Sequence, residues 1–291
     1  MYGHVAVLLS EALHYLDPRP GQRFIDATFG AGGHTQALLE RTAPGGSVLA
    51  LDLDETALIQ AGTEFTAYGD RLKLVHANFK DVREVAQAQG FLDVDGILAD
   101  IGVSSMMLDD PERGFSFMRE GDLDMRMDRS QSLTAAEIVN AYSERDIADI
   151  LYIYGEERRS RPIARSIVRS RPLKSTLDLA RAVQKVLGPP RFGRIHPATR
   201  TFQALRIAVN GELDNLQHFL KSAPDCLRPG GRLAVITFHS LEDRIVKNSF
   251  RDLAAGRPLT KKVVTATAEE IESNLRSRSA KLRVWEKNHG N

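Results

Sequence analysis

The chain has 291 residues, a formal net charge of +1 and 42% hydrophobic residues, enough for one large domain or two modest ones. No apolar run approaches the length of a membrane span, and the run at residues 5–9 is too short for the core of a signal peptide. The single cysteine, Cys226, excludes an internal disulfide and a cysteine-based zinc cage. We therefore expect a cytoplasmic protein with no membrane partner and no bound metal.

The first hundred residues alternate between helix and strand patterns. After a helix predicted at residues 7–16, apolar runs predict strands at 24–28, 48–53, 72–76 and 96–101. Amphipathic patterns predict helices between them, at 34–41, 55–65 and 82–88. Alternation of this kind predicts an α/β fold with a mostly parallel sheet that helices cover on both faces.

A glycine turn joins the first predicted strand to its helix. Residues 26–34 read Asp-Ala-Thr-Phe-Gly-Ala-Gly-Gly-His, a pattern that places a ligand at the N-terminus of a helix. The dinucleotide fingerprint G-x-G-x-x-G would need glycine at position 35, where this chain has Thr35. The second strand ends in a carboxylate, Asp52. Together these features favour S-adenosylmethionine over NAD. S-adenosylmethionine has no pyrophosphate for the turn to bind, but it offers ribose hydroxyls and an ammonium group to carboxylates.

Candidate ligand residues follow four successive strands, at the edge of an open parallel sheet where ligands bind. Each has a structural alternative, such as a turn cap, an ion pair, a core position or an N-cap. Because all four fall at one edge, we interpret them as a single crevice, with the helix-start residue His34 as a further candidate contact. The four are Asp26 with its glycine turn, Asp52, Asn78 with Phe79, and Asp100.

The alternation stops after the fourth strand, and helical patterns follow at residues 134–142, 144–154, 162–169, 176–187 and 198–210. Residues 155–206 hold eleven Arg and two Lys against three acids, a local excess of +10. Residues 104–154 hold five Arg against eleven acids, a local −6. A solvated helix face is one interpretation of the basic run. Arginines with few interspersed acids favour nucleic-acid contact instead.

Strand patterns return near the C-terminus. A helix at 213–227 precedes a strand at 231–238, and a last strand at 281–285 is expected to form a hairpin with residues 259–265. The helical block thus interrupts the sheet. We expect a discontinuous cofactor-binding domain of residues 1–107 and 211–291, with residues 108–210 as an inserted, RNA-binding helical cap.

Seven sequence blocks resemble the bacterial 16S ribosomal RNA cytosine-N4 methyltransferases, the MraW or RsmH family, at residues 30–34, 100–105, 112–118, 122–128, 154–158, 196–203 and 238–244. The resemblance covers nearly the whole chain. It implies a Rossmann-like class I methyltransferase fold with a helical domain inserted after strand four. It also implies S-adenosylmethionine as the methyl donor and a decoding-centre cytidine of 16S rRNA, or of the small ribosomal subunit, as the target.

The resemblance carries particular residues onto this sequence. It implies cofactor contacts at Gly32, Gly33, His34, Asp52, Phe79 and Asp100, and we expect a further contact at Gly30 in the glycine turn. The family usually has Gln two residues after the Ser-Ser pair, where this chain has Met107, whose thioether we expect to pack against the cofactor. We expect RNA contacts from Arg113, Arg126, Arg194, His196, Arg200 and Arg244.

Three residues are candidates for catalysis. The N4 amine of cytosine is a poor nucleophile because its lone pair is delocalised into the ring, so an acceptor for N4–H would assist transfer. Asp100 is the leading candidate, and His239 and Asp124 are weaker ones. His239 has a structural alternative, in which it merely precedes a capping box formed by Ser240 and Asp243.

The carboxylates within residues 122–128 are expected to pair with Arg126 and Arg129 rather than to hold a metal, since the glycine and glutamate of a calcium loop are missing. Other functions stay open at this point. Thr35 disfavours a nicotinamide enzyme. A methyltransferase for another nucleic acid would share the crevice, and a non-catalytic RNA-binding ribosome assembly factor would not need the strand-end acids. The oligomeric state is also open, a dimer being one option.

Overall fold

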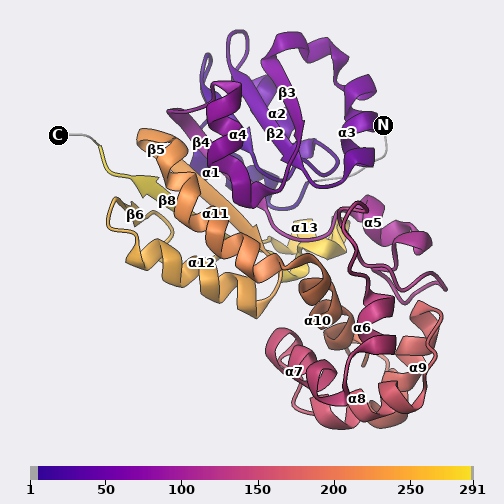
Figure 1. Cartoon of the computed structure of the whole chain (residues 1–291). Coiled ribbons are helices and arrows are strands. Elements are labelled where there is room, and N and C mark those ends of the chain that lie inside the picture. The colour runs from indigo at the N-terminus through magenta and orange to yellow at the C-terminus, as the bar shows by residue number, and fades with distance from the viewer. Residues whose placement is uncertain (1–5, 290–291) are drawn as a thin grey trace. The chain divides into compact units, whose positions relative to one another are not determined.

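The computed structural model describes residues 6–289 and divides the chain into two compact units. We call Met1–Gly102 with Leu213–Asn291 the sheet unit, and Val103–Glu212 the helical unit. In the sequence, the helical unit begins after the fourth strand of the sheet and ends before the fifth strand (Figure 1). The sequence placed the bounds of this insertion at residues 108 and 210, and the helical unit runs from Val103 to Glu212.

The sheet unit contains one mixed sheet with the strand order β3-β2-β1-β4-β5-β8-β6. The first five strands in this order are parallel, as predicted, whereas β8 runs antiparallel to β5. β6 and β7 both pair antiparallel with β8, so the expected C-terminal hairpin forms. The strands are β1 (Arg23–Asp26), β2 (Ser47–Asp52), β3 (Leu72–His76), β4 (Val94–Asp100), β5 (Leu227–Thr237), β6 (Gly256–Pro258), β7 (Val264–Thr265) and β8 (Lys281–Lys287).

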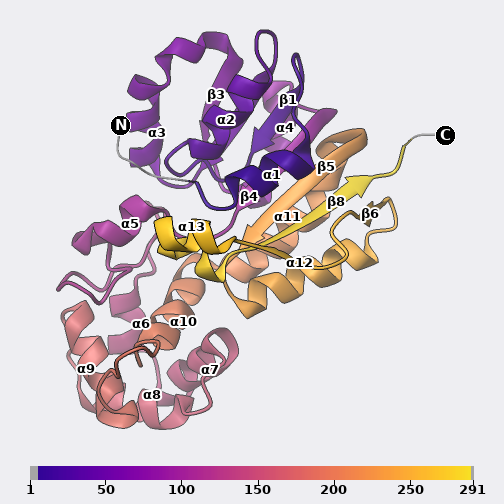
Figure 2. The ribbon, with the colours of Figure 1, turned by 180° about the vertical axis from the view of Figure 1, so that it is seen from behind.

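Helices cover both faces of this sheet. On one face lie α4 (Val82–Gln89), α11 (Glu212–Cys226) and α12 (Ser240–Asp252), which pack around Phe219 (Figure 1). On the other lie α1 (Leu9–Leu16), α2 (Gly33–Arg41) and α3 (Glu55–Glu64), which pack around Phe24 (Figure 2). The remaining pieces are short: η1 (Thr66–Arg71), η2 (Phe79–Asp81), α13 (Ala268–Ser273) and η4 (Leu275–Ser279).

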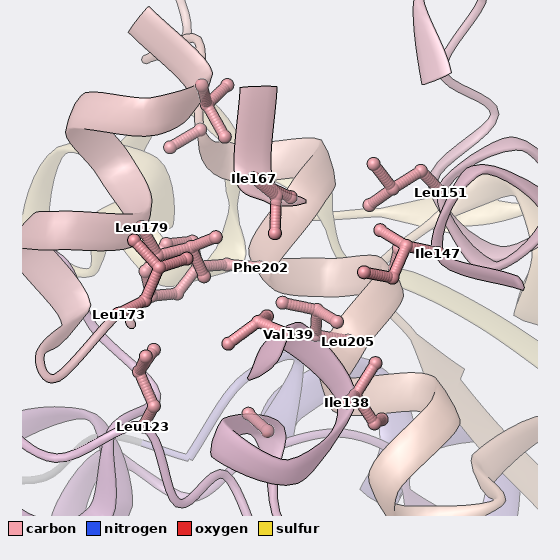
Figure 3. Close-up of a cluster of buried hydrophobic side chains, with 14 of the residues drawn as sticks. Leu123, Ile138, Val139, Ile147, Leu151, Ile167, Leu173, Leu179, Phe202 and Leu205 are labelled. Carbon is pink, nitrogen blue, oxygen red and sulfur yellow. The ribbon is translucent and has the colours of Figure 1, made fainter. Parts of the chain in front are cut away.

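The helical unit has its own hydrophobic core, in which Ile138, Ile167 and Leu205 are fully buried (Figure 3). Polar caps fix where its helices begin: Thr134, Ser143 and Ser175 each accept a hydrogen bond from a backbone N–H of the first turn. Its elements are α5 (Ser105–Asp109), η3 (Pro111–Arg113), α6 (Ala135–Ala141), α7 (Glu144–Gly155), α8 (Ser160–Arg169), α9 (Thr176–Leu187) and α10 (Thr199–Asn210). Among residues 6–289, no helix is both long and apolar enough to cross a membrane.

Candidate functional site

Three parallel strands of the sheet end in aspartates. β1, β2 and β4 finish at Asp26, Asp52 and Asp100, and β1 pairs in parallel with both of the other strands. The carboxyl ends of parallel strands meet at one edge of a sheet, which is where open α/β folds bind ligands. The structure therefore gathers the predicted acids at this edge.

The glycine turn after β1 is held by Asp52. The backbone N–H of Gly30 donates to Asp52 Oδ2 at 2.6 Å, and the N–H of Asp54 donates to Oδ1 at 2.8 Å. Gly30 has a φ of +56°, and a Cβ built there would meet nothing within 4 Å. A left-handed backbone beside open space is the environment in which a ligand approaches a main chain closely. Asp52 thus shapes the turn, and burial raises the pKa of its carboxyl.

The two later glycines of the turn have packing roles. A Cβ on Gly32 would lie 2.4 Å from the Phe65 ring, and one on Gly33 would lie 3.0 Å from Ala6 Cβ. Only glycine avoids the first clash, and Gly32 also has a φ of +79°. Of the three glycines predicted to contact the cofactor, the structure gives Gly30 the open position. It accounts for Gly32 and Gly33 by close packing within the sheet unit.

Asp26 is fully buried and hydrogen-bonded to Thr35 and to Thr28, of which the sequence singled out only the first. The Thr35 hydroxyl donates to Asp26 Oδ2 at 2.7 Å, and the Thr28 N–H donates to Oδ1 at 3.2 Å. The Thr28 hydroxyl in turn accepts from the N–H of Asp100 at 2.6 Å. Burial raises the pKa of Asp26 to about 7, although the Thr35 bond works against that rise. Thr35 thus stands at the position of the third glycine of the dinucleotide fingerprint, and its hydroxyl forms a hydrogen bond with Asp26.

One carboxyl oxygen of Asp100 receives no hydrogen bond from any residue that the structure describes. Its side chain exposes 24% of its surface, yet Oδ1 is buried and has no hydrogen-bond partner among residues 6–289. Oδ2 lies 3.9 Å from Nδ1 of His34, beyond hydrogen-bond distance. Burial, with the charges of Asp26 and Glu242, raises the pKa of Asp100 to about 8. A buried polar atom without a partner is costly, so it marks a place where a ligand donor fits.

His34 is a buried, neutral imidazole at the start of α2. Its Nε2 lies 3.0 Å from the carbonyl oxygen of Val7 and donates to it, which leaves Nδ1 without a proton. Burial lowers the pKa of His34 to about 4. Phe79, after β3, is half-buried and packs edge-on against Phe219 at a centroid distance of 5.4 Å. Both residues lie in the sheet unit, as their predicted cofactor role requires.

His239 forms the N-cap of α12, so the capping box lies one residue earlier than predicted. His239 Nδ1 accepts from the Glu242 N–H at 3.4 Å, and Glu242 Oε2 accepts from the backbone N–H groups of Phe238 and His239. His239 Nε2 lies 2.9 Å from Glu242 Oε1. Asp243, expected in the box, instead pairs with Arg283 at 2.7 Å. Both ring nitrogens of His239 lie close to Glu242, yet Nε2 has no hydrogen-bond partner in the described part of the chain.

Two of the predicted RNA-binding arginines are structural. Arg113 is buried, and its guanidinium donates to the carbonyl oxygens of Arg126 and Met127 at 3.1 and 2.9 Å. Arg126 forms a bidentate pair with Asp124, at 2.7 and 2.9 Å, and donates to two further carbonyl oxygens of its own loop. These arginines hold the 122–131 loop of the helical unit, and their contact with RNA stays a prediction. The expected pairing of Asp124 with Arg126 is confirmed.

The other predicted RNA contacts differ in exposure. Arg194 is exposed, and Arg200 exposes 59% of its side chain while one of its nitrogens lies 3.9 Å from Glu157. Arg244 is exposed on α12 of the sheet unit. His196 is different: its ring stacks on Phe117 at 4.3 Å, and its Nδ1 accepts from the Ala198 N–H at 3.1 Å. It anchors the end of a loop within the helical unit.

Met107 lies in the helical unit. The Ser104 hydroxyl accepts from its N–H and caps α5, and the Met107 side chain is 4% exposed in the core of the helical unit. This core also contains Phe115 and Met125, and the expected contact of the thioether with the cofactor stays a prediction. The sequence pointed to the position but not to this role, because a buried Met fits either environment.

The residues at the strand ends suit S-adenosylmethionine. Asp52 has further lone pairs for ribose hydroxyls, Gly30 leaves open space beside the turn, and Asp100 Oδ1 lacks a donor. The parallel order β3-β2-β1-β4-β5, the antiparallel β8 and this acidic edge define a Rossmann-like methyltransferase of class I.

Comparison with known proteins gives the family. The model of the MraW methylase family matches residues 1–288, and the chain belongs to this family. Its donor is accordingly S-adenosylmethionine, as the sequence predicted. The chain is 54% identical over 284 residues to "Ribosomal RNA small subunit methyltransferase H" of Sorangium cellulosum, covering 97% of this chain and 90% of that protein. It is 51% identical over 287 residues to the protein of the same name from Nostoc punctiforme, covering 98% and 94%.

Solved structures align over similar lengths at lower identity. A putative rRNA methylase from Clostridium thermocellum aligns with a TM-score of 0.48 and 11% identity, covering 98% of this chain and 99% of that one. TrmN from Thermus thermophilus aligns with a TM-score of 0.47 and 15% identity, covering 96% of this chain and 48% of that one.

Proposed function

We propose that this protein methylates small-subunit ribosomal RNA, and that the methyl group goes to N4 of a cytidine in the decoding centre of 16S rRNA. The relatives named as small-subunit rRNA methyltransferases support the class of substrate. The sequence blocks shared with the cytosine-N4 methyltransferases support the base and the atom. A substrate of this kind places the protein in the cytoplasm. The observation that carries a catalytic role is the buried, unpartnered Oδ1 of Asp100 beside the glycine turn.

The sheet unit supplies the donor site. S-adenosylmethionine, when bound, supplies an electrophilic methyl group on a sulfonium, so positioning accounts for much of the rate. Asp52 accepts hydrogen bonds from the ribose, and Gly30 lets the ligand approach the main chain. Phe79 provides an apolar surface after β3, and His34 stays neutral beside a cationic ligand because burial lowers its pKa.

We assign to Asp100 the role of accepting a hydrogen bond from an N–H group of the methyl donor or of the target base. Its raised pKa of about 8 keeps it protonated in the free protein at neutral pH, and a nearby cation favours its carboxylate form. The carboxylate then accepts a hydrogen bond either from the ammonium of the donor or from the N4 amine of the target. His239 is a positioning residue in this proposal, because both of its ring nitrogens face Glu242 at the N-terminus of α12.

The helical unit supplies the RNA-binding surface. Arg158, Arg161 and Arg169 are exposed, in addition to Arg194 and Arg200. Guanidinium groups bind phosphate oxygens in a bidentate manner and stack on bases, so an exposed set of them suits single-stranded RNA. The target base has to be unstacked before it reaches the donor, which favours a substrate whose target strand is unpaired.

The test is a methyl-transfer assay on substrates that lack the modification. Small subunits, and naked 16S rRNA, from cells without a MraW-family enzyme would be incubated with the protein and a labelled donor. Digestion to nucleosides and mass spectrometry should then reveal N4-methylcytidine, at one site. The Asp100→Asn variant should transfer far less label. Label at another base or in another nucleic acid would support the alternative methyltransferase, and RNA binding without any label would support an assembly factor.

A further inference from the structure

A tight turn in the helical unit places an aromatic ring at its tip. The N–H of Arg194 donates to the carbonyl oxygen of Arg191 at 3.1 Å, which makes Phe192 and Gly193 the central residues of a four-residue turn. Gly193 has a φ of +71°, the left-handed value that the second central position of a type II turn requires. A Cβ on Gly193 would meet nothing within 4 Å. Glycine is therefore present for the shape of the turn and not for packing.

The Phe192 ring has no structural role in the described chain. Its relative exposure is 107%, higher than that of any other large hydrophobic residue that the structure describes. A single exposed apolar side chain is common on protein surfaces, so exposure alone indicates no function. Here, however, the backbone is specifically shaped around the ring: a left-handed glycine follows it, and Pro189 and Pro190 restrict the chain before it.

Contacts of His196 hold the chain in place just after the turn. Two residues after it, His196 stacks on Phe117 with a centroid distance of 4.3 Å and an interplanar angle of 23°. The Nδ1 atom of His196 accepts from the Ala198 N–H, and the Gln184 side-chain amide lies 3.1 Å from Nε2 of the same ring. Phe117 also contacts Phe202 of the unit's core edge-on at 4.9 Å. The ring of Phe192 is thus held away from the core by an anchored loop.

The charges beside the ring indicate the partner. Arg191 and Arg194 are the first and last residues of the turn. Both are exposed, and neither makes an ion pair with any residue in the 6–289 range. A protein-binding hot spot sits in a wider apolar surface that is depleted of charge. One aromatic ring between two unpaired guanidinium groups matches a chain of flat bases joined by phosphates instead.

We propose that Phe192 stacks on an unpaired base of RNA while Arg191 and Arg194 contact the phosphates on either side. The inference rests on the proposed function, since it assumes an RNA substrate, and it adds a specific base-stacking residue. Stacking needs an accessible base face, so single-stranded RNA should engage the ring and duplex RNA should not.

A tryptophan at the tip would report stacking directly. The chain's only tryptophan, Trp285, is fully buried, so the parent protein provides a constant fluorescence background for Phe192→Trp. Single-stranded oligocytidylate should quench the added emission. Inorganic polyphosphate, which has the charges without bases, and duplex RNA should not. Equal responses to oligocytidylate and polyphosphate would overturn the proposal, because they would mean that charge alone is sensed.

Affinity measurements separate this inference from the function on which it rests. Phe192→Ala should bind single-stranded RNA roughly 5- to 150-fold more weakly, the effect of losing about 1–3 kcal/mol of stacking, with an unchanged salt slope. Ile59→Ala, a substitution of an exposed residue on α3 of the sheet unit, is the matched control and should leave RNA affinity unchanged. If Phe192→Ala binds as tightly as the parent, Phe192 does not stack. If the parent itself binds no RNA, the proposed function fails first.

Discussion

The strand-end acids of the sheet unit and the enclosed acids of the helical unit are held in opposite ways. Asp26 and Asp100 have no cation at bonding distance among residues 6–289, and their pKa values rise to about 7 and about 8. The helical unit joins its enclosed acids to arginines, as in Arg126–Asp124 and Arg206–Glu212, both 2.7 Å. The difference teaches that a buried acid without a partner marks a ligand site, whereas an acid in a close ion pair belongs to the scaffold. A count of charges along the sequence does not distinguish an acid at a ligand site from an acid in a structural ion pair.

The largest effect is expected from breaking a scaffold pair. Arg126→Met should destabilise the helical unit by about 3 kcal/mol or more, because Asp124 would be left as a largely enclosed charge without its partner. Chemical denaturation followed by far-UV circular dichroism measures this loss. The double variant Arg126→Met with Asp124→Leu should recover much of it. A stable Arg126→Met protein with weakened RNA binding would place Arg126 on the ligand surface and break the comparison.

The pH dependence of stability tests the sheet unit. His34 has a folded pKa of about 4 against an ordinary value of 6.5, so the unfolded chain binds more protons between these values and stability falls as pH falls. The contribution is about 3 kcal/mol, complete above pH 6.5 and lost on acidification to pH 4. Asp26 and Asp100 work in the opposite direction, because their raised pKa values favour the folded state at low pH.

A variant isolates the histidine from the acids. His34→Gln keeps a side-chain donor for Val7 and keeps both acids, so its stability should fall less than that of the parent between pH 6.5 and pH 4. Urea unfolding at a series of pH values gives the comparison. Parallel pH profiles for the two proteins would show that His34 is not held neutral in the fold.

A smaller effect is expected at the ligand acid. Asp100→Asn should weaken S-adenosylmethionine binding by about 1.5–3 kcal/mol, the range for a hydrogen bond to a charged group. The thermal midpoint should stay the same or rise, because the change removes a buried acid that lacks a partner at Oδ1. Calorimetry and a thermal melt provide the two readouts. Unchanged donor affinity with a reduced transfer rate would instead assign Asp100 to the N4 amine of the target.

Proton release sharpens the same test. In the parent, the donor's positive charge should favour ionised Asp100, so binding at pH 7 should release a proton and affinity should rise with pH up to about 8. Calorimetry in two buffers with different heats of ionisation measures that release. The Asp100→Asn variant should lose it.

The smallest effect is expected on the exposed face of the helical unit. Arg194→Gln should reduce the salt slope of RNA binding by about 0.7, the value for one phosphate contact on a single strand, and leave stability unchanged. Arg113→Gln, which removes a buried guanidinium, is the contrasting variant and should lower stability instead. Fluorescence anisotropy at several salt concentrations gives the slopes. Equal slopes for Arg194→Gln and the parent would make Arg194 a bystander.

The sequence predicted the sheet well because its signals are local. The apolar runs that became β1 to β4 alternate with amphipathic helices, and each run carries its own turn residues. The edge at which Asp26, Asp52 and Asp100 meet follows from the parallel connections, whereas the order of the strands required coordinates. Even the breakdown of the dinucleotide pattern at Thr35 was visible, although its physical reason, the bond to Asp26, required coordinates.

The roles that the sequence did not predict depend on partners far along the chain or on fine geometry. Arg113 resembles any basic residue until its contacts with the carbonyl oxygens of Arg126 and Met127 are known. The capping box shifted by one residue because an imidazole Nδ1 accepts the helix N–H as an oxygen would, which frees Asp243 to bind Arg283. Phe192 carried no signal of a specific role in the sequence.

The insertion point has a consequence for how the chain folds during its synthesis. β4 pairs with β1, whose residues come earlier, and with β5, which follows only after the whole of Val103–Glu212 has been made. At ordinary translation rates that delay lasts on the order of 5–20 s. Throughout it, one side of β4 remains an unpaired strand edge, and such edges recruit other chains. The nascent protein therefore has a vulnerable interval, which closes when β5 arrives and joins β4.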